Sequence, residues 1–238
     1  ANVAAIAAGL GQPFPVVASI ITAIGLDQDS DWAAAELSHR RVELIIPRER
    51  RSGRLSRALV LVEANGRRTI VAEPSLLDAV DVQHFVETTD PSMTRWWLHL
   101  EGYQVPGQIA AVAKARANRL RALGSAQIEK LAASRVGMIE NVLVTLGAEG
   151  AAAVTRDGAI SEARALPVDV VDTTGAGDSF VGGFLAAWLN HCPLPQALHL
   201  ACAAGSLQVT RFGAQELRPS ASELIRLVGA SNVSTPAF

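Results

Sequence analysis

The sequence predicts an α/β fold, with a mainly parallel sheet, helices on both of its faces and a smaller β-sheet beside it. Three observations lead to this class. Residues 168–189 read as a buried strand that breaks at glycines and runs into a helix. Residues 16–37 read as a second strand followed by a helix, and residues 42–72 carry β-rich runs with no helix between them. We expect one domain over residues 1–238, with residues 42–72 inserted as a β-rich subdomain.

The composition is that of an ordinary globular protein. Of 238 residues, 49% are hydrophobic and 18% are charged, which is enough for one substantial core. The formal net charge of -2 gives no support for a nucleic-acid or membrane-surface partner. Cys192 and Cys202 are too few for a disulfide framework, the sequence has no transmembrane run, and its alanine-rich start lacks a basic signal-peptide region. We therefore expect a cytoplasmic protein with reduced cysteines.

The stretch VDVVDTTGAGDSFVGGFLAAWL, residues 168–189, carries the strongest functional signal. The first backbone N–H groups of a helix have no intrahelical partner, and the helix dipole adds positive character there. Two glycines, Gly175 and Gly177, allow this backbone to approach a ligand closely. The turn is therefore predicted to be an anion site suited to phosphate. Apolar residues recur at helical spacing after it, namely Phe180, Val181, Phe184, Leu185 and Trp188.

Asp178 stands at the mouth of this predicted anion site. A carboxylate repels phosphate, so its presence makes sense if it accepts a proton from a hydroxyl that attacks a phosphoryl group. An isolated Asp in a first helical turn would more simply be a favourable partner of the helix dipole. The grouping of Asp172, Thr173, Gly175, Gly177 and Asp178 after an apolar segment favours catalysis.

The sequence DTTGAGDSF resembles the C-terminal signature of the ribokinase-like (PfkB) carbohydrate kinases. Segments 97–102 and 66–70 also resemble ketohexokinase-like members. The resemblance implies a three-layer αβα ribokinase-like fold, with Asp178 as catalytic base and an anion hole formed by Gly175, Ala176 and Gly177. Two other phosphate motifs do not fit, because the chain has no G-x-x-x-x-G-K-[ST] loop and has Phe180 where a dinucleotide motif needs a third glycine.

The resemblance also implies an acceptor site. Asn2 and Glu101 correspond to residues that contact the sugar in the family, together with Asp178. Taken alone, Asn2 could equally cap a helix. Glu101, at the end of an apolar strand over residues 96–100, could equally be a loop residue that faces solvent.

The nucleotide side is implied by two further segments. Thr145 to Gly150 resembles the family's nucleotide-binding loop, although a Gly-x-x-Gly turn alone is usually only a turn. Residues 209–214 resemble the wall of the adenine pocket. The implied ATP contacts are Thr145, Gly147, Gly150, Thr174, Gly175, Gly177, Cys202 and Gly213. Asp172 and Thr174, with backbone carbonyls, are implied ligands of a monovalent cation such as K⁺, but Asp172 could equally brace the turn.

Residues 42–72 are expected to form an antiparallel lid from strands at 42–46, 58–62 and 67–72. Asn65-Gly66 is a strong hairpin-turn signal, and the basic loop 48–57 is expected to be a solvated face. In the family such a sheet covers the sugar site and often forms a dimer interface, so a homodimer through the lid is implied. A lid excludes water, which prevents hydrolysis of ATP in place of transfer.

The remaining elements are expected from periodicity and from cap signals. An alanine-rich helix ends at Gly9, a helix covers 106–117, and no strand is expected over 118–133. Strands are expected at 141–146 and 151–155 with an Asp157-Gly158 turn, followed by a helix over 195–209 and a last helix that opens with a Ser220/Glu223 capping box.

The pattern of the family is broken near residue 118. The expected strand and an Asn-x-x-Glu motif that helps to hold Mg²⁺ are missing, which suggests that residues are absent between Ala117 and Leu120. The implied function is ATP- and Mg²⁺-dependent phosphorylation of a sugar hydroxyl. The alternatives are a nucleoside kinase of the same family and a sugar- or nucleotide-binding relative that does not catalyse.

Overall fold

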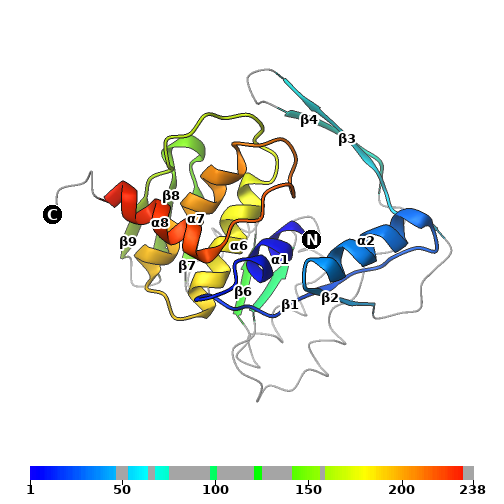
Figure 1. The fold of residues 1–238 in the computed structure, drawn as a ribbon, viewed down its shortest axis with the longest axis horizontal. Coiled ribbons are helices and arrows are strands. Elements are labelled where there is room, and N and C mark those ends of the chain that lie inside the picture. The colour runs from blue at the N-terminus through cyan, green and yellow to red at the C-terminus, as the bar shows by residue number, and fades with distance from the viewer. Residues whose placement is uncertain are drawn as a thin grey trace, which may run out of the picture.

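The computed structural model describes residues 1–46, 53–63, 68–74, 97–100, 121–124, 141–155 and 159–232. Figure 1 shows two neighbouring groups of elements. The first half of the chain supplies α1, β1, α2 and β2, and the C-terminal part supplies β7–β9 and α6–α8. Helix α1 packs against both groups, because it contacts α6 as well as β1 and β2. None of the described helices has the length and apolarity needed to cross a membrane.

The N-terminal group is a strand–helix–strand unit. Helix α1 (Asn2–Gly9) leads into β1 (Ala18–Ile21), and α2 (Gln28–His39) connects β1 to β2 (Val42–Ile45). The two strands pair in parallel, with Ala18 opposite Val42. The prediction that 42–46 belongs to the antiparallel lid is therefore wrong. A strand that returns through a helix lies parallel to its predecessor, which places β2 in the main layer.

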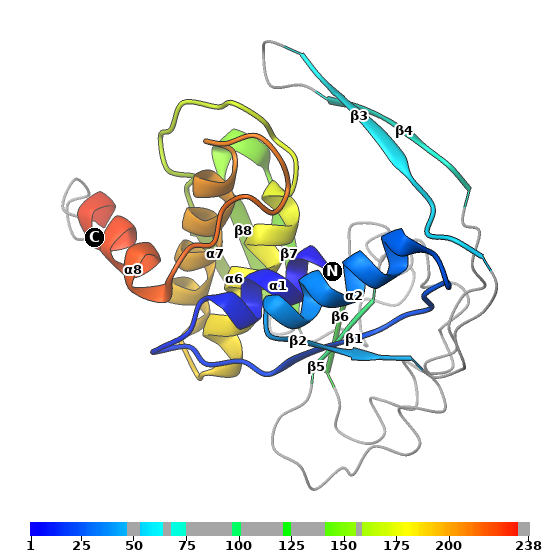
Figure 2. The same ribbon diagram turned by 45° about the vertical axis from the view of Figure 1, so that its right-hand side comes forward.

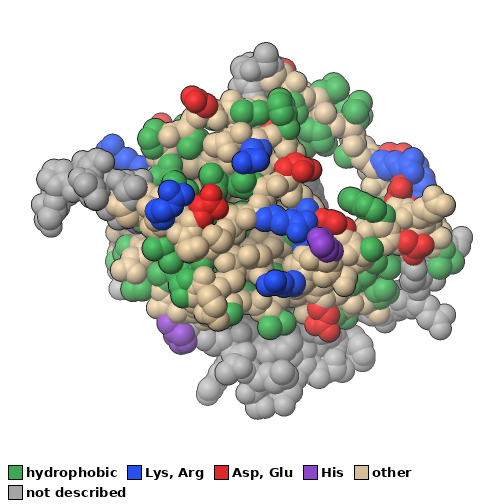
Figure 3. All heavy atoms as spheres, viewed as in Figure 1, with side chains coloured by type: hydrophobic (Ala, Val, Ile, Leu, Met, Phe, Trp, Pro, Cys, Tyr) green, Lys and Arg blue, Asp and Glu red, His purple; other side chains and the backbone are tan. Residues whose placement is uncertain are grey.

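The lid hairpin consists of β3 (Ala58–Val62) and β4 (Arg68–Ala72). The strands pair antiparallel, as predicted, with Val60 opposite Ile70. Figures 1 and 2 show the hairpin extending away from both groups of elements. In Figure 3, hydrophobic side chains lie along this hairpin at the upper edge of the molecule. The Asn65-Gly66 turn lies outside the described residues.

Ion pairs anchor the base of the lid hairpin. Arg54 donates to both carboxylate oxygens of Glu73 at 2.8 Å, and Arg57 contacts Asp29 of α2 at 2.5 Å. These hydrogen bonds from Arg54 lower the pKa of Glu73 to about 2, with a further contribution from the Arg57 amide. Arg54 and Arg57, the arginines of the predicted solvated loop 48–57 that the structure describes, therefore bind neighbouring elements, although they remain exposed to water.

A second pair of parallel strands includes a strand that the sequence did not predict. Strand β5 (Trp97–Leu100) confirms the predicted strand, and it pairs in parallel with β6 (Arg121–Gly124). No strand was expected over 118–133, so that prediction is wrong. The sequence RALG has little strand propensity, and its pairing with β5 overrides the local preference. The helix predicted over 106–117 lies outside the described residues.

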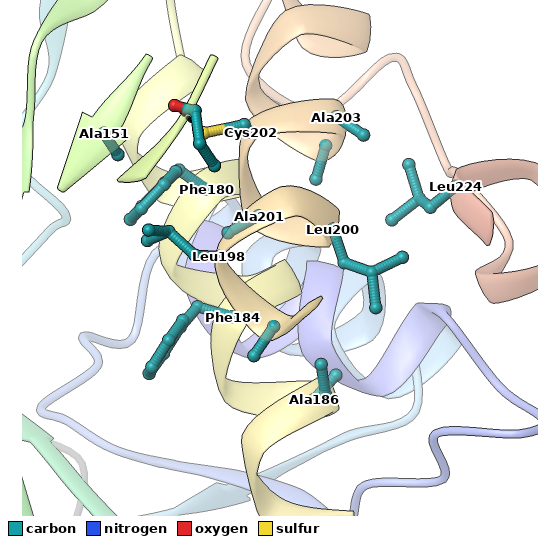
Figure 4. Packing of buried hydrophobic residues seen from close by; sticks show 14 of the residues in the cluster. Ala151, Phe180, Phe184, Ala186, Leu198, Leu200, Ala201, Cys202, Ala203 and Leu224 are labelled. Carbon is teal, nitrogen blue, oxygen red and sulfur yellow. Dashed lines mark hydrogen bonds between the residues drawn. The ribbon is translucent and has the colours of Figure 1, made fainter. Parts of the chain in front are cut away.

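The C-terminal group contains the main core. Strands β7 (Asn141–Thr145), β8 (Ala151–Thr155) and β9 (Ile160–Ala163) form an antiparallel sheet. Helices α6 (Ala176–Leu189), α7 (Leu194–Gln208) and α8 (Ala221–Asn232) follow it. Figure 4 shows Phe180 and Phe184 of α6 beside Leu198 and Cys202 of α7, with Ala151 of β8 close by. The predicted apolar stripe of α6 therefore faces the core.

The segment before the glycine turn is not a strand. Residues 164–170 form no regular structure, and Val170 is 50% exposed. The amides of Val171 and Asp172 both donate to the Val209 carbonyl, at 2.8 and 3.2 Å. The prediction of a buried strand is wrong because this backbone hydrogen-bonds to the end of α7 rather than to a neighbouring strand. Among the described residues the strands form four separate sheets, which hold two parallel and three antiparallel strand pairs.

Candidate active site

The glycine turn opens α6 as predicted. Gly175 is the N-cap residue and has a φ of 79°, in the left-handed region that favours glycine. A Cβ at this position would lie 2.9 Å from the Cα of Ala214, so the following loop packs directly on the turn. By contrast, a Cβ on Gly177 would meet nothing within 4 Å. The two glycines therefore have different roles, since one permits the turn and the other leaves open space beside it.

Backbone amides are available at this open space. Within the first turn, Ser179 N donates to Gly175 O at 2.9 Å and Ala176 N to Thr173 O at 3.3 Å. No described residue accepts a hydrogen bond from the amides of Gly177 or Asp178. Free amides and a positive helix end are the features that bind an oxyanion.

Asp172 braces the turn from inside. Its side chain is buried, with 2% of the residue exposed. One carboxylate oxygen accepts from the Thr174 amide at 2.9 Å and from the Thr174 hydroxyl at 2.6 Å. The other accepts from the Gly213 amide at 2.9 Å. These hydrogen bonds compensate the burial of a charged group and join the turn to the 209–214 loop.

Two predicted site residues meet at the mouth of the turn. Asn2 Nδ2 donates to Asp178 Oδ2 at 2.7 Å. The side-chain amide of Gln215 in turn donates to Asn2 Oδ1. With its oxygen held by Gln215, the Asn2 amide must present its NH₂ group to Asp178. The carboxylate of Asp178 is therefore held in a defined position and is not turned into the core, since Asp178 is half-buried.

Close packing of α1 on α6 brings Asn2 to Asp178. A Cβ on Gly182 would lie 2.8 Å from the Cβ of Ile6 and 2.9 Å from the Val3 carbonyl. Only glycine lets the two helices approach this closely. Four residues of α1 are buried, namely Ala5, Ile6, Ala7 and Ala8, and of these Ala5 and Ala8 pack with Val42 of β2.

An arginine at the end of α2 holds Gln215 in place. Arg40, directly after α2, donates to the Gln215 carbonyl at 3.1 Å and to Glu36 at 2.5 Å. The hydrogen bond from Arg40 lowers the pKa of Glu36, so the pair is ionised at neutral pH. Gln215 is thus fixed through its backbone by Arg40 and through its side chain by Asn2.

The predicted nucleotide loop has the backbone that its glycines suggested. Gly147 (φ 61°) opens a short 3-10 turn, η3 (Gly147–Glu149), between β7 and β8, and Gly150 (φ 108°) follows it. A Cβ on Gly150 would lie 2.0 Å from the Ala163 carbonyl, whereas one on Gly147 would meet nothing within 4 Å. Gly150 is thus required by packing, while Gly147 and Thr145 stay candidates for contact with ATP.

Cys202 and Gly213 occupy different surroundings. Gly213 lies in the loop that packs on the turn, next to Asp172. Cys202 is 5% exposed in the main core, its thiol donates to the Ala163 carbonyl at 3.5 Å, and burial raises its pKa to about 11. A packing role accounts for Cys202 in this structure, and its contact with ATP stays a prediction. Glu101 lies outside the described residues.

Sequence reasoning missed Gln208 and Gln215. Gln208 is fully buried, and it hydrogen-bonds Ser179, Thr174 and Gly213 around the glycine turn. A signal for it was present, because Gln208 follows an otherwise apolar helix face at helical spacing. Gln215 gives no such signal, since a glutamine in a loop is ordinarily solvated.

Metal ligands are not evident in the described part of the chain. No group of three or more His, Cys, Asp or Glu side chains there could hold a metal ion. The ligands of Mg²⁺ stay unassigned.

Comparisons with known proteins point to one family. The sequence pattern of the pfkB family carbohydrate kinases matches residues 108–221. A ribokinase from Haemophilus influenzae is 38% identical over 90 residues, which are 38% of this chain and 29% of the relative. An ATP-dependent ribose-1-phosphate kinase from Halopiger xanaduensis is 30% identical over 247 aligned positions, covering 90% of this chain and 80% of the relative.

The fold comparison points the same way. The structure of aminoimidazole riboside kinase from Salmonella enterica, complexed with its riboside and an ATP analogue, superposes with a TM-score of 0.73 at 20% identity, covering 95% of this chain and 90% of that one. The fold is therefore the α/β ribokinase-like fold. The chain belongs to the pfkB family of carbohydrate kinases. It spans about a third of the length of the ribokinase and fructokinase that it matches.

Proposed function

We propose that this protein transfers the γ-phosphate of ATP to a hydroxyl of a small carbohydrate. The observation that carries the proposal is the hydrogen bond from Asn2 Nδ2 to Asp178 Oδ2 at 2.7 Å. It lies beside amides at the start of α6 from which no described residue accepts a hydrogen bond. A carboxylate next to an anion-binding turn places a proton acceptor beside the position of a transferring phosphoryl group.

Each group has a defined role in this proposal. Asp178 accepts the proton of the attacking hydroxyl, and Asn2 holds the carboxylate and contacts the sugar. The amides of Gly175, Ala176 and Gly177 stabilise charge on the moving phosphoryl group, and that of Ala176 must first leave the Thr173 carbonyl. One such donor is typically worth about 3 kcal/mol. Mg²⁺, bound to the phosphates of ATP, would neutralise part of their charge.

The acceptor class follows from the relatives. Their names include a ribokinase, a fructokinase and a ribose-1-phosphate kinase, all of which act on small sugars. A nucleoside acceptor is the second candidate, because an aminoimidazole riboside kinase from Salmonella typhimurium is 41% identical over 90 residues. A sugar- or nucleotide-binding protein without catalysis is the alternative from another class.

An assay of ADP release separates these candidates. Purified protein would be supplied with Mg·ATP and, in turn, pentoses, ketoses, ribose 1-phosphate and nucleosides. Turnover on a free or phosphorylated sugar supports the proposal, and preference for a nucleoside supports the second candidate. Saturable binding of sugar and ATP in calorimetry, without ADP release on any acceptor, would leave only the non-catalytic alternative.

We also propose that the lid hairpin pairs with a second copy of the chain. Leu59, Leu61 and Val71 project from one face, with Leu59 opposite Val71, and they are 60, 52 and 58% exposed. Val60 and Ile70 on the opposite face are 39 and 52% exposed. A two-stranded ribbon that leaves apolar residues open on both faces is unstable alone in water.

Light scattering after size exclusion tests this assembly. The wild-type chain is expected at twice its 25.0 kDa mass, and Leu61→Glu is expected at the monomer mass. Thr69→Glu, opposite Leu61 on the same face, is a milder control because it replaces a residue that is already polar. A monomeric wild-type chain at micromolar concentration would contradict the proposal.

A further inference from the structure

We infer that the side-chain amide of Gln208 takes the place of the monovalent cation that the resemblance implies at Asp172 and Thr174, so that the turn is held without K⁺. This inference concerns the support of the turn and stands whether or not the protein is a kinase. It follows from the partners of one buried side chain.

Gln208, the last residue of α7, lies fully buried behind the glycine turn, with 0% exposure. Its Nε2 donates to the Gly213 carbonyl at 2.6 Å and to the Thr174 carbonyl at 3.3 Å. Its Oε1 accepts from the Ser179 hydroxyl at 3.3 Å. Every polar atom of the amide is therefore used.

The orientation of this amide follows from chemistry. Thr174 and Gly213 present carbonyl oxygens, which can only accept hydrogen bonds. The NH₂ group of Gln208 must therefore face them, and its oxygen must face the Ser179 hydroxyl. A neutral hydrogen-bond donor is thus offered to two carbonyl oxygens that belong to the turn and to the loop that packs on it.

Backbone carbonyls and a carboxylate are the oxygens with which proteins replace the hydration shell of K⁺. Here these oxygens already have donors. The carbonyls of Thr174 and Gly213 accept from Gln208, and both oxygens of Asp172 accept from Thr174 and Gly213. A cation would have to displace the Gln208 amide to reach the two carbonyls, and the displaced amide would then be buried without partners.

The residues present therefore do not fit a cation at this place. The carboxylate charge of Asp172 is compensated by three hydrogen bonds, and the two loops that a cation would join are joined by Gln208. Because the covalently attached amide is always present, the support of the anion turn would not vary with salt composition.

Thermal unfolding in different salts tests the inference. Melting temperatures would be measured in KCl and in tetramethylammonium chloride at equal ionic strength, since the second cation is too large to enter. The wild-type melting temperature is expected to be the same in both salts. A gain of about 5 °C in KCl, the size that a millimolar cation site would give, would overturn the inference.

Variants at position 208 sharpen the test. Gln208→Glu keeps the shape but sets a carboxylate against two carbonyls, so it is expected to melt several degrees higher in KCl than in tetramethylammonium chloride. Gln208→Ala removes the amide and is expected to show the same direction of dependence. Gln28→Glu, an equal change at an exposed position of α2, is expected to show none.

Circular dichroism would first confirm that Gln208→Glu is folded. Equal melting temperatures of this variant in the two salts would then contradict the inference. If the wild-type protein does not release ADP, the proposed function fails while these melting results still decide the role of Gln208. If it does, its turnover is expected to be equal in the two salts, and severalfold activation by KCl would overturn the inference.

Discussion

Asn2 Nδ2 lies 2.7 Å from Asp178 Oδ2, although the two residues are 176 positions apart in the chain. The hydrogen bond links the first residue of α1 to the first turn of α6. It sets the position of the proposed base before any substrate binds, which is the kind of preorganisation that catalysis requires.

The proposed base gives the first prediction. Asp178→Asn keeps the size of the side chain but removes its ability to accept a proton. We expect turnover to fall on the order of 10³-fold, with affinity for ATP unchanged in calorimetry. Near-normal turnover in this variant would remove Asp178 from the role of base.

The glycine turn gives the second prediction. Gly177→Ala adds a methyl group in open space, so the protein is expected to melt as the wild type does but to lose about 10²-fold in turnover, because the methyl group occupies the anion site. Gly175→Ala is expected to lower the free energy of unfolding by about 1–3 kcal/mol, since its φ is positive and Ala214 is close. Full activity of Gly177→Ala would show that the phosphoryl group does not bind there.

Gln215 gives the third prediction. In Gln215→Ala the Asn2 amide loses its orienting donor, and we expect kcat/KM for the sugar to fall about tenfold, the value of one hydrogen bond. If Gln215 acts through Asn2, the same substitution is expected to have little further effect in an Asn2→Ala background. Fully additive losses would contradict that link. Gln28→Ala serves as the control at an exposed position.

The crossing of α1 and α6 gives the fourth prediction. Gly182→Ala places a methyl group against Ile6 and the Val3 carbonyl, so we expect a loss of about 1–3 kcal/mol in urea unfolding. Gly229→Ala is the matched control. It lies in α8 with nothing within 4 Å of an added Cβ, and is expected to gain about 0.5–1 kcal/mol. Equal stability of both variants would contradict the close approach at Gly182.

The base of the lid gives the fifth prediction. The pKa of Glu73 is lowered to about 2 from 4.5, so its ionised form is favoured in the folded chain. The stabilisation is complete above pH 4.5 and is lost as the pH falls toward 2. Glu73→Gln is therefore expected to melt below the wild type at pH 7, and this difference should shrink as the pH falls from 4.5 to 2. A difference independent of pH would contradict the pairing; Glu162→Gln, at an exposed position of β9, is the control for loss of one negative charge.

The sequence predicted local features well where a residue type has one physical use. A glycine turn before an apolar helix predicted the N-terminus of α6, and glycines at 147 and 150 predicted the turn between β7 and β8. The structure brings Asn2 and Asp178 together, and the roles that the family resemblance implied for them stay predictions. No local pattern in the sequence could show this contact, because it depends on how two distant helices pack.

The wrong predictions share a cause, which is that tertiary contacts override local preference. The run at 168–171 looks like a strand, yet the amides of Val171 and Asp172 bond to the end of α7. Residues 121–124 do not look like a strand, yet they pair with β5. Strand β2 was assigned to the lid from its composition, although the intervening helix α2 already implied a parallel partner.

The long separation between α1 and α6 has a consequence during synthesis. A ribosome that adds roughly 5–20 residues per second needs on the order of 10 s to extend the nascent chain from Asn2 to Asp178. During that interval the eight-residue α1 has no α6 to pack against, and a helix of this length is not stable alone in water. The contact between Asn2 and Asp178 must therefore form late in synthesis, after α6 has been added to the chain.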